Sequence, residues 1–261
     1  KLLNSSSGAV EDEIFRFRCN RLNYYAVSLL LARVGLWAGD MEKARENAFV
    51  VVTATEALSP LKFTNAAMIG DPAALENIEP RLQTEILFGT YNRNEPDWTN
   101  VYFGQNSSTL LAIDDKVGIF AANGDDCRLQ AIPGNVHSKY MLYGLSLAQM
   151  TAAQYIMPVL RIPEAYFIYA ESSFDDYKDD AIYYFNQFVE ARNNDVLEVP
   201  QDITKEDFME QLVQEFRREY LSEGQIVFMY KRLNLPLRSS AGNTANNGNL
   251  VLPVPDSEAG V

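Results

Sequence analysis

The sequence has 261 residues, of which 47% are hydrophobic and 22% are charged, an ordinary composition for a chain that buries a core. Its formal net charge is −13 and Lys and Arg form no dense cluster, so nucleic acid and anionic lipid are unfavourable partners. No run of about 18 apolar residues occurs, so the sequence predicts no membrane-spanning helix.

Residues 14–56 are predicted to form a pair of helices. Gly39 suits the left-handed position that ends the first helix, and Asp40 suits the N-cap of the second. Because the turn between them is so short, the two helices are expected to pack antiparallel. Apolar residues at three- and four-residue spacing predict one apolar stripe on the first helix: Leu22, Tyr25, Ala26, Leu29, Leu30 and Val34.

Residues 57–138 are predicted to form a loop-rich excursion that faces a ligand. Residues 85–89 have the pattern of a short strand or buried extended segment, but residues 91–133 are rich in Asn, Asp and Gly and are predicted to be non-helical. So long a non-helical stretch in a compact protein is usually a functional surface or a small subdomain.

A second helix pair is predicted over residues 163–192, and a third long helix follows Thr204. Pro163 fits the first turn of its helix, and Thr204 with Asp207 predicts a capping box. Small residues at the expected helix crossings resemble tetratricopeptide packing: Ala44, Ala48, Ala170 and Ala181. The predicted fold class is therefore mostly α, with tetratricopeptide-like helix pairs around a loop-rich excursion.

No catalytic centre is recognisable in the sequence. His137 is the only histidine, and residues 144–148 lack the second glycine of a nucleophile elbow. Adjacent carboxylates such as Asp114–Asp115 and Asp179–Asp180 are more typical of solvated turns and helix N-termini than of a glycosidase pair. We therefore expect no catalytic residue and no enzyme.

The sequence also predicts no bound metal or cofactor. Cys19 and Cys127 have no metal-ligand spacing, and a disulfide, two free thiols or a buried pair all remain open. Residues 123–126 lack the ligand alternation of an EF-hand loop, which leaves calcium only weakly supported. No phosphate loop or dinucleotide fingerprint occurs.

Aromatic residues interleaved with polar ones make residues 91–105 the candidate ligand surface. An exposed Trp or Tyr ring can stack on the C–H face of a sugar while Asn, Asp and Arg bind its hydroxyls. Trp98 is the strongest single candidate, since polar residues flank it. The six candidate ligand-binding residues are Trp98, Tyr91, Tyr102, Asn100, Asp97 and Arg93.

Seven segments in chain order resemble the C-terminal portion of SusD/RagB-type proteins. They are Arg21–Val52, Thr84–Phe88, Asp126–Arg128, Lys139–Tyr140, Val159–Glu171, Glu219–Arg232 and Leu252–Glu258. Each motif is weak alone, but their common order over most of the chain makes the resemblance specific. One departure is that Ile226, Val227 and Met229 stand where the late element usually continues with Arg, an aromatic residue and Asp.

The resemblance implies a single SusD/RagB-like domain over residues 1–261, without the family's N-terminal portion. It further implies a nutrient-binding lipoprotein on the extracellular face of the outer membrane, held there only by a lipid anchor upstream of this chain. Such proteins capture oligosaccharides, or sometimes peptides, for a SusC-like TonB-dependent transporter and are not enzymes. The alternative from the residues themselves is a helical-repeat scaffold that binds a protein or peptide.

Overall fold

The computed structural model describes residues 21–57, 61–70, 79, 81–103, 113, 116–120, 126–140, 155–192, 198–238 and 244–245. The chain divides into two compact units, Lys1–Glu219 and Tyr220–Val261. Cys19, Asp114–Asp115 and the Leu252–Glu258 motif lie outside the described residues. None of the helices within the described ranges combines the length and apolarity that a bilayer crossing requires.

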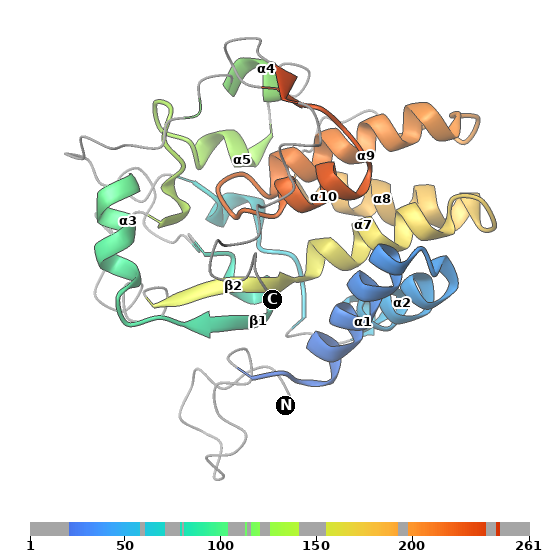
Figure 1. Ribbon diagram of the computed structural model, residues 1–261, viewed down its shortest axis with the longest axis horizontal. Coiled ribbons are helices and arrows are strands. Elements are labelled where there is room, and N and C mark those ends of the chain that lie inside the picture. The colour runs from blue at the N-terminus through green and yellow to red at the C-terminus, as the bar shows by residue number, and fades with distance from the viewer. Residues whose placement is uncertain are drawn as a thin grey trace, which may run out of the picture. The chain divides into compact units, whose positions relative to one another are not determined.

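The first unit is built around a row of four helices, α1 (Tyr24–Ala38), α2 (Met41–Ala57), α7 (Ile162–Ser173) and α8 (Lys178–Arg192). In this row α2 packs between α1 and α7, and α7 packs on α8 (Figure 1). The four predicted crossing residues Ala44, Ala48, Ala170 and Ala181 are all 0% exposed, since small side chains let the helices approach closely. The mostly helical fold is therefore confirmed, and both predicted helix pairs are present, although α1 begins at Tyr24 and not near residue 14.

Local capping explains where these helices begin and end. Gly39 has φ 75° and closes α1 in the left-handed conformation, and its N–H donates back to the carbonyls of Gly35 and Leu36. The Asp40 carboxylate accepts from the Lys43 N–H at 3.1 Å, as an N-cap does. Pro163 lies in the first turn of α7, where its missing N–H costs no hydrogen bond.

The third long helix, α9 (Lys205–Glu219), follows the row in sequence and packs on α7. The Asp207 N–H donates to Thr204 Oγ1 at 3.1 Å, and that hydroxyl donates to Asp207 Oδ2 at 2.8 Å. The predicted cap is present, with the carboxylate accepting from the Thr204 hydroxyl. Phe208 and Leu212 are both 0% exposed and carry the predicted apolar stripe into the core.

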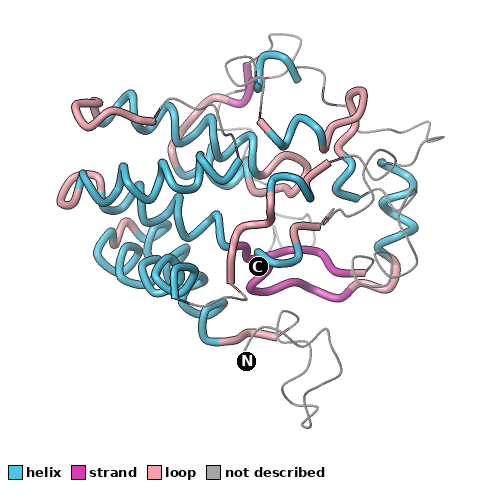
Figure 2. The backbone as a smooth tube through the Cα atoms, turned by 180° about the vertical axis from the view of Figure 1, so that it is seen from behind, coloured by secondary structure: helices cyan, strands magenta, loops and turns pink. Residues whose placement is uncertain are grey.

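β1 (Ile86–Tyr91) and β2 (Ile156–Arg161), which are distant in sequence, pair antiparallel as a two-stranded sheet. Figure 2 shows the two strands side by side in magenta. β2 runs directly into α7, and at the opposite end of the sheet Tyr91 pairs with Ile156. The strand predicted at residues 85–89 is thus confirmed, and α3 follows it in the chain at the end of the sheet away from α7.

The prediction that residues 91–133 are non-helical is wrong in the described part. This region contains α3 (Glu95–Phe103), α4 (Lys116–Phe120) and α5 (Cys127–Gln130). Two short 3-10 turns precede it, Ala66–Met68 and Gln83–Glu85, and one follows it, Ser138–Tyr140. Such short helices depend on tertiary contacts more than on their own sequences. A helix of one or two turns also shows too little hydrophobic periodicity to be recognised in the sequence.

The predicted stripe of α1 is only partly on the buried side. Ala26 and Leu29 are 0% exposed, whereas Leu22, Leu30 and Val34 are 55%, 38% and 56% exposed. The prediction failed because α1 is apolar on both sides, so a helical period alone could not select the buried face.

The second unit contains α10 (Ile226–Arg232) and a pair of two-residue strands, β3 (Leu237–Arg238) and β4 (Thr244–Ala245). The strands pair antiparallel, with Leu237 opposite Ala245.

Candidate functional site

The predicted ligand residues lie on α3 and in the end of β1 and the turn that lead to it. Trp98 is 63% exposed and Tyr102 is 37% exposed. Because these two residues are four positions apart on a helix, they lie on the same side of α3. The structure therefore brings two of the three aromatic candidates, Trp98 among them, to one exposed surface.

α3 is held in place by a side adjacent to that of Trp98 and Tyr102. Phe103 is 8% exposed and packs with Val136 and Tyr140, its ring centroid 5.0 Å from that of Tyr140. Thr99 is 6% exposed and lies on the same buried side. With Phe103 anchored, Trp98 and Tyr102 stay on an exposed side of the helix.

Tyr91 lies at the end of β1 and forms a separate aromatic pair. Its ring centroid is 5.5 Å from that of Tyr155, a residue that sequence reasoning did not select. The Asn92 N–H donates to the Tyr155 carbonyl at 2.7 Å, and this bond extends the antiparallel pairing of β1 and β2 by one step. Tyr155 has φ 73°, a left-handed conformation that costs energy for a bulky residue.

The polar candidates are exposed but do not lie on the side of α3 that carries Trp98 and Tyr102. Asp97 and Asn100 are on the helix and Arg93 is in the turn before it, and all three are exposed. Asn100 lies two positions from Trp98, which places it on a different side of the helix. The Asn94 N–H donates to Asn92 Oδ1 at 3.0 Å, which helps to fix the turn that carries Arg93.

A second feature of the unit is a buried charge network built from the motifs that carried the family resemblance. Arg161 Nη1 is 2.9 Å from Glu85 Oε2 and 2.7 Å from Glu219 Oε1. Arg192 contacts the same two carboxylates, at 2.7 Å to Glu85 Oε1 and 2.9 Å to Glu219 Oε2. All four side chains are at most 1% exposed.

Arg128 extends the network toward α5. It binds Asp126 through both carboxylate oxygens, at 2.9 and 2.6 Å, and reaches Glu215 Oε2 at 2.7 Å. Its contact with Glu219 is longer, at 3.4 Å. Burial alone would lower the pKa of Arg128, but Glu215 and Asp126 outweigh it and raise the pKa well above the usual value.

Glu219 remains ionised at the centre of the network. Burial alone would raise its pKa, but Arg192 and Arg161 outweigh that effect and hold the pKa well below 4.5. A charge this deeply buried is tolerated only because it is paired and hydrogen-bonded on several sides. The role of the network is therefore structural.

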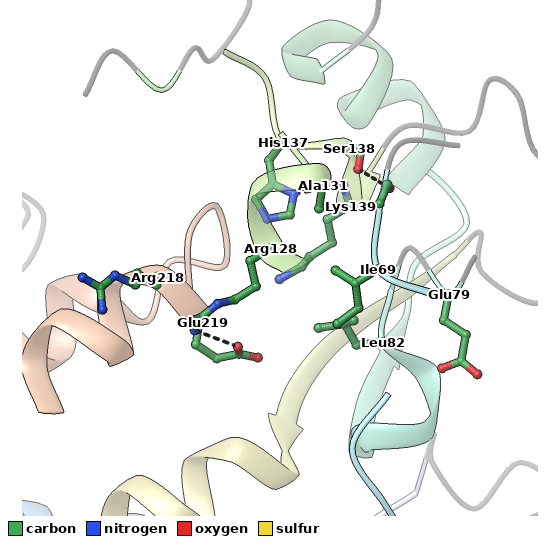
Figure 3. Close-up of a pocket in the computed structure, with 11 residues that line it drawn as sticks. Ile69, Glu79, Leu82, Arg128, Ala131, His137, Ser138, Lys139, Arg218 and Glu219 are labelled. Carbon is green, nitrogen blue, oxygen red and sulfur yellow. Dashed lines mark hydrogen bonds and ion pairs between the residues drawn. The ribbon is translucent and has the colours of Figure 1, made fainter. Parts of the chain in front are cut away.

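A small cavity lies beside this network (Figure 3). Its volume is about 20 Å³, which is enough for one water molecule and far too small for a sugar ring. Figure 3 shows Arg128, His137 and Lys139 on one side and Ile69 and Leu82 on the other. None of the six predicted ligand residues lines this cavity.

His137, the sole histidine, lines the cavity and is 5% exposed. Burial, with Lys139 adding to it, lowers its pKa well below 6.5, so the ring is neutral at pH 7. The Lys139 N–H donates to its Nδ1 at 3.1 Å. Cys127 is also buried, and burial raises its thiol pKa to about 12, which leaves it a poor nucleophile.

Comparison with known proteins gives clear similarity in structure at low sequence identity. No protein-family model matches the chain, and no curated protein matches it significantly. A SusD superfamily protein from Bacteroides vulgatus superposes with a TM-score of 0.71 and 19% identity, over 91% of this chain and 57% of its own. A SusD superfamily protein from Bacteroides thetaiotaomicron gives 0.68 and 19%, over 91% and 58%.

A SusD-like carbohydrate binding protein from Bacteroides vulgatus gives a TM-score of 0.64 and 17% identity, over 85% of this chain and 48% of its own. This chain thus spans about half to three-fifths of the length of the structures it matches. At these identities the comparison establishes the fold, which is SusD-like.

Proposed function

We propose that this SusD-like chain binds oligosaccharide and does not alter it chemically, with the outer surface of α3 as the contact. The observation that carries the proposal is the pairing of exposed Trp98 and Tyr102 on one side of a helix anchored by Phe103. The name of one solved structure of the same fold, a SusD-like carbohydrate binding protein, supports a sugar as the ligand class.

The chemistry of the surface suits a sugar ring. The indole of Trp98 offers a flat apolar face to the axial C–H bonds, and the Tyr102 ring extends that face along the helix. Asp97 supplies hydrogen-bond acceptors and Arg93 supplies donors beside it. Tyr91 with Tyr155 forms a second aromatic element at the end of the β1–β2 sheet, which suits a ligand longer than one sugar.

A non-catalytic role agrees with the condition of the reactive groups in the described part of the chain. His137 and Cys127 are buried, and the carboxylates at the centre of the structure are committed to arginine. We further propose that the chain acts at the extracellular face of an outer membrane, lipid-anchored, and delivers its ligand to a SusC-like TonB-dependent transporter. The SusD-like fold supports this setting.

Isothermal titration against a panel of oligosaccharides tests the ligand and the site together. Trp98→Ala is expected to weaken binding by about tenfold, because an aromatic contact is worth about 0.5–1.5 kcal/mol beyond its buried area. The chain offers a matched control, because its only other tryptophan, Trp37, is exposed on α1. Trp37→Ala should leave the affinity unchanged.

The same pair of tryptophans gives a second readout. In a Trp37→Phe variant, Trp98 is the only source of indole fluorescence, so ligand stacking should change its emission directly. Unchanged affinity in Trp98→Ala would remove α3 from the site. Absence of sugar binding together with capture of an extended peptide would favour the alternative, a helical-repeat scaffold.

A further inference from the structure

A layer of aromatic rings crosses one side of the helix row, from α2 over α7 to α8. Phe49 on α2 stacks on Tyr169 of α7, with ring centroids 5.3 Å apart, and its centroid is 6.3 Å from that of Tyr184 on α8. The rings of Tyr169 and Tyr184 are 5.1 Å apart, and that of Tyr183 is 5.0 Å from Tyr184. We call these four residues the α2–α8 aromatic face.

Two rings of this face are open to solvent. Phe49 is 41% exposed and Tyr183 is 52% exposed, whereas Tyr169 and Tyr184, which link them, are 5% and 9% exposed. The buried pair fixes the exposed pair in place, so the face presents rigid aromatic area to solvent. Exposed aromatic rings of this kind are enriched where proteins contact their partners.

Exposed carboxylates flank both exposed rings at the same spacing. On each of the two helices, one acid precedes the ring by three positions and another follows it by seven, so both lie on its side of the helix. The four acids are Glu46 and Glu56 around Phe49, and Asp180 and Glu190 around Tyr183.

Carboxylates from both helices act on the centre of the face. Burial raises the pKa of Tyr184 to about 12, and Glu56 on α2 and Asp180 on α8 both add to the shift. The negative charge therefore surrounds the aromatic layer and does not lie on one helix alone.

The basic side chains of α2 and α8 are engaged elsewhere. Lys43 Nζ is 3.0 Å from Asp40 Oδ2, and Lys178 Nζ donates to the Ile203 carbonyl at 2.7 Å. Arg192 is buried in the charge network. The aromatic face and its acids thus attract a cation that these helices do not supply.

One end of the face shows how such a cation is held. The Arg45 guanidinium lies 4.6 Å from the centroid of the Tyr177 ring, and its Nη1 is 3.2 Å from Asp176 Oδ2. Arg45 precedes Phe49 by four positions, so it lies on the same side of α2. An arginine between a ring and a carboxylate gains from both contacts. The exposed rings and acids further along the face offer the same combination.

The spread of the acids indicates the size of the partner. Glu46 and Glu56 are ten positions apart, as are Asp180 and Glu190, and ten residues of a helix span about 15 Å. A small cation cannot contact both ends of that distance, whereas an extended chain covers it with about four or five residues. The partner is therefore a polypeptide segment with basic side chains about four residues apart.

We propose that the α2–α8 aromatic face, with its four flanking acids, binds an extended segment of another protein that carries arginine or lysine. An arginine of this segment stacks on Phe49 or Tyr183, and its charge pairs with a neighbouring carboxylate. A second copy of this chain is an unfavourable partner, because two chains that each carry a net charge of −13 repel one another. The proposal concerns residues outside α3 and does not depend on sugar binding.

Fluorescence anisotropy with a labelled Gly-Ser peptide that carries arginine at about every fourth position tests the proposal. This peptide is expected to bind, and the affinity should fall as salt is added, because salt screens exposed charges. The control peptide has citrulline in place of arginine, which keeps the shape and removes the charge, and it is expected not to bind. No binding of the arginine peptide, or equal binding of both peptides, overturns the proposal.

Variants of the chain place the peptide on the face. Tyr183→Leu keeps an apolar side chain but loses the ring, and Glu56→Gln loses one exposed charge. Each is expected to weaken binding by about two- to fivefold. The matched controls are Tyr24→Leu, an exposed ring on α1, and Glu210→Gln, an exposed acid on α9, and both should leave the affinity unchanged. Unchanged affinity in both Tyr183→Leu and Glu56→Gln overturns the proposal.

Two further measurements separate this site from other ligands. Trp98→Ala should leave the peptide affinity unchanged, and a loss would place the peptide on α3 and overturn the proposal. Spermidine that binds as tightly as the arginine peptide would make a small polyamine the ligand class, which also overturns it.

Discussion

At the scale of single residues, Glu219 is a buried carboxylate that pairs with three arginines. Its two oxygens receive Arg161 and Arg192 at 2.7 and 2.9 Å, with Arg128 at 3.4 Å. Removing one charge of a buried pair leaves its partners desolvated and uncompensated. Glu219→Gln is therefore expected to lower the free energy of unfolding by about 3–5 kcal/mol, measured by denaturant titration.

The control for this prediction lies on the same helix. Glu210 is exposed on α9, and Glu210→Gln should change the free energy of unfolding by no more than about 0.5 kcal/mol. If the two variants are equally stable, the ion pairs of Glu219 contribute nothing to the free energy of unfolding. The occurrence of these charged residues in the motifs would then have another cause.

Gly35 is a residue whose importance is invisible in the sequence. A Cβ on Gly35 would lie 2.8 Å from Ala44 N and 3.2 Å from Ala44 Cα, so α1 and α2 approach closely at this point. Alanine in a helix usually stabilises by up to about 1 kcal/mol relative to glycine, but here it must push two backbones apart. Gly35→Ala is expected to destabilise by about 1–3 kcal/mol in denaturant titration.

A helix-propensity control separates the two effects. Ala38→Gly, at an exposed position of the same helix, should cost about 1 kcal/mol or less. A stabilising effect of Gly35→Ala would mean that α1 and α2 lie further apart than described here.

For single residues, the sequence correctly predicted that Trp98 is exposed, but it did not predict how the side chains of the candidate site are arranged. The polar flanks of Trp98 indicated an exposed ring, and the ring is exposed. That Trp98 and Tyr102 share a side of a helix could not be predicted while the segment had no recognised period. Tyr155 was overlooked because its partner, Tyr91, is brought to it only by the pairing of two strands distant in sequence. Whether these residues bind a ligand stays a prediction.

At the scale of elements, caps were the most informative local signals. Asp40 and Thr204 were identified as helix starts because their side chains can accept from backbone N–H groups two or three residues on. Such a rule involves only neighbours in sequence, so no tertiary information is needed. By contrast, the buried side of α1 depends on what surrounds it, and the predicted Leu30 and Val34 turned out exposed.

The cap of α9 allows a quantitative check. Thr204→Ala removes the oxygen that receives the Asp207 N–H and is expected to cost about 1 kcal/mol in thermal or denaturant unfolding. Thr204→Ser keeps that oxygen and should retain most of the stability. Equal losses in both variants would show that the methyl group, not the hydrogen bond, matters at this position.

At the scale of the whole molecule, stability should depend on pH in two stages. The pKa of His137 is well below 6.5 in the folded chain, so only the unfolded chain takes up this proton as the pH falls through 6.5. Stability is therefore lost below about pH 6.5, by at most about 1.4 kcal/mol per pH unit. A second loss begins below about pH 4.5, where the unfolded chain protonates Glu219 and the folded chain does not.

Because the chain has one histidine, the first stage can be assigned without ambiguity. Urea titrations of His137→Gln between pH 7 and pH 5 should show no histidine slope, while the loss below pH 4.5 remains. An unchanged slope in this variant would place the titrating group elsewhere.

The fold could be predicted in outline because the motifs occur in the same order as in the family, even though each motif alone is weak. Glu85, Asp126–Arg128, Arg161 and Glu219 each belong to a weak motif, and the structure shows why they occur together: they pair with one another. Arg192 and Glu215 belong to the same network but lie outside every motif used. Their roles required the three-dimensional arrangement, since isolated charged residues on helices are usually solvated.

The network also constrains the time at which this chain can fold. Glu85 and Arg192 are separated by 107 positions, which takes roughly 5–20 s to synthesise. Arg161, the first arginine to reach Glu85, follows it by 76 positions, so the early carboxylate must stay hydrated at least until Arg161 has been made. The α1–α2 pair needs only local contacts and can form at once. The unit can therefore complete its fold only after Arg192 and Glu219 have both been synthesised.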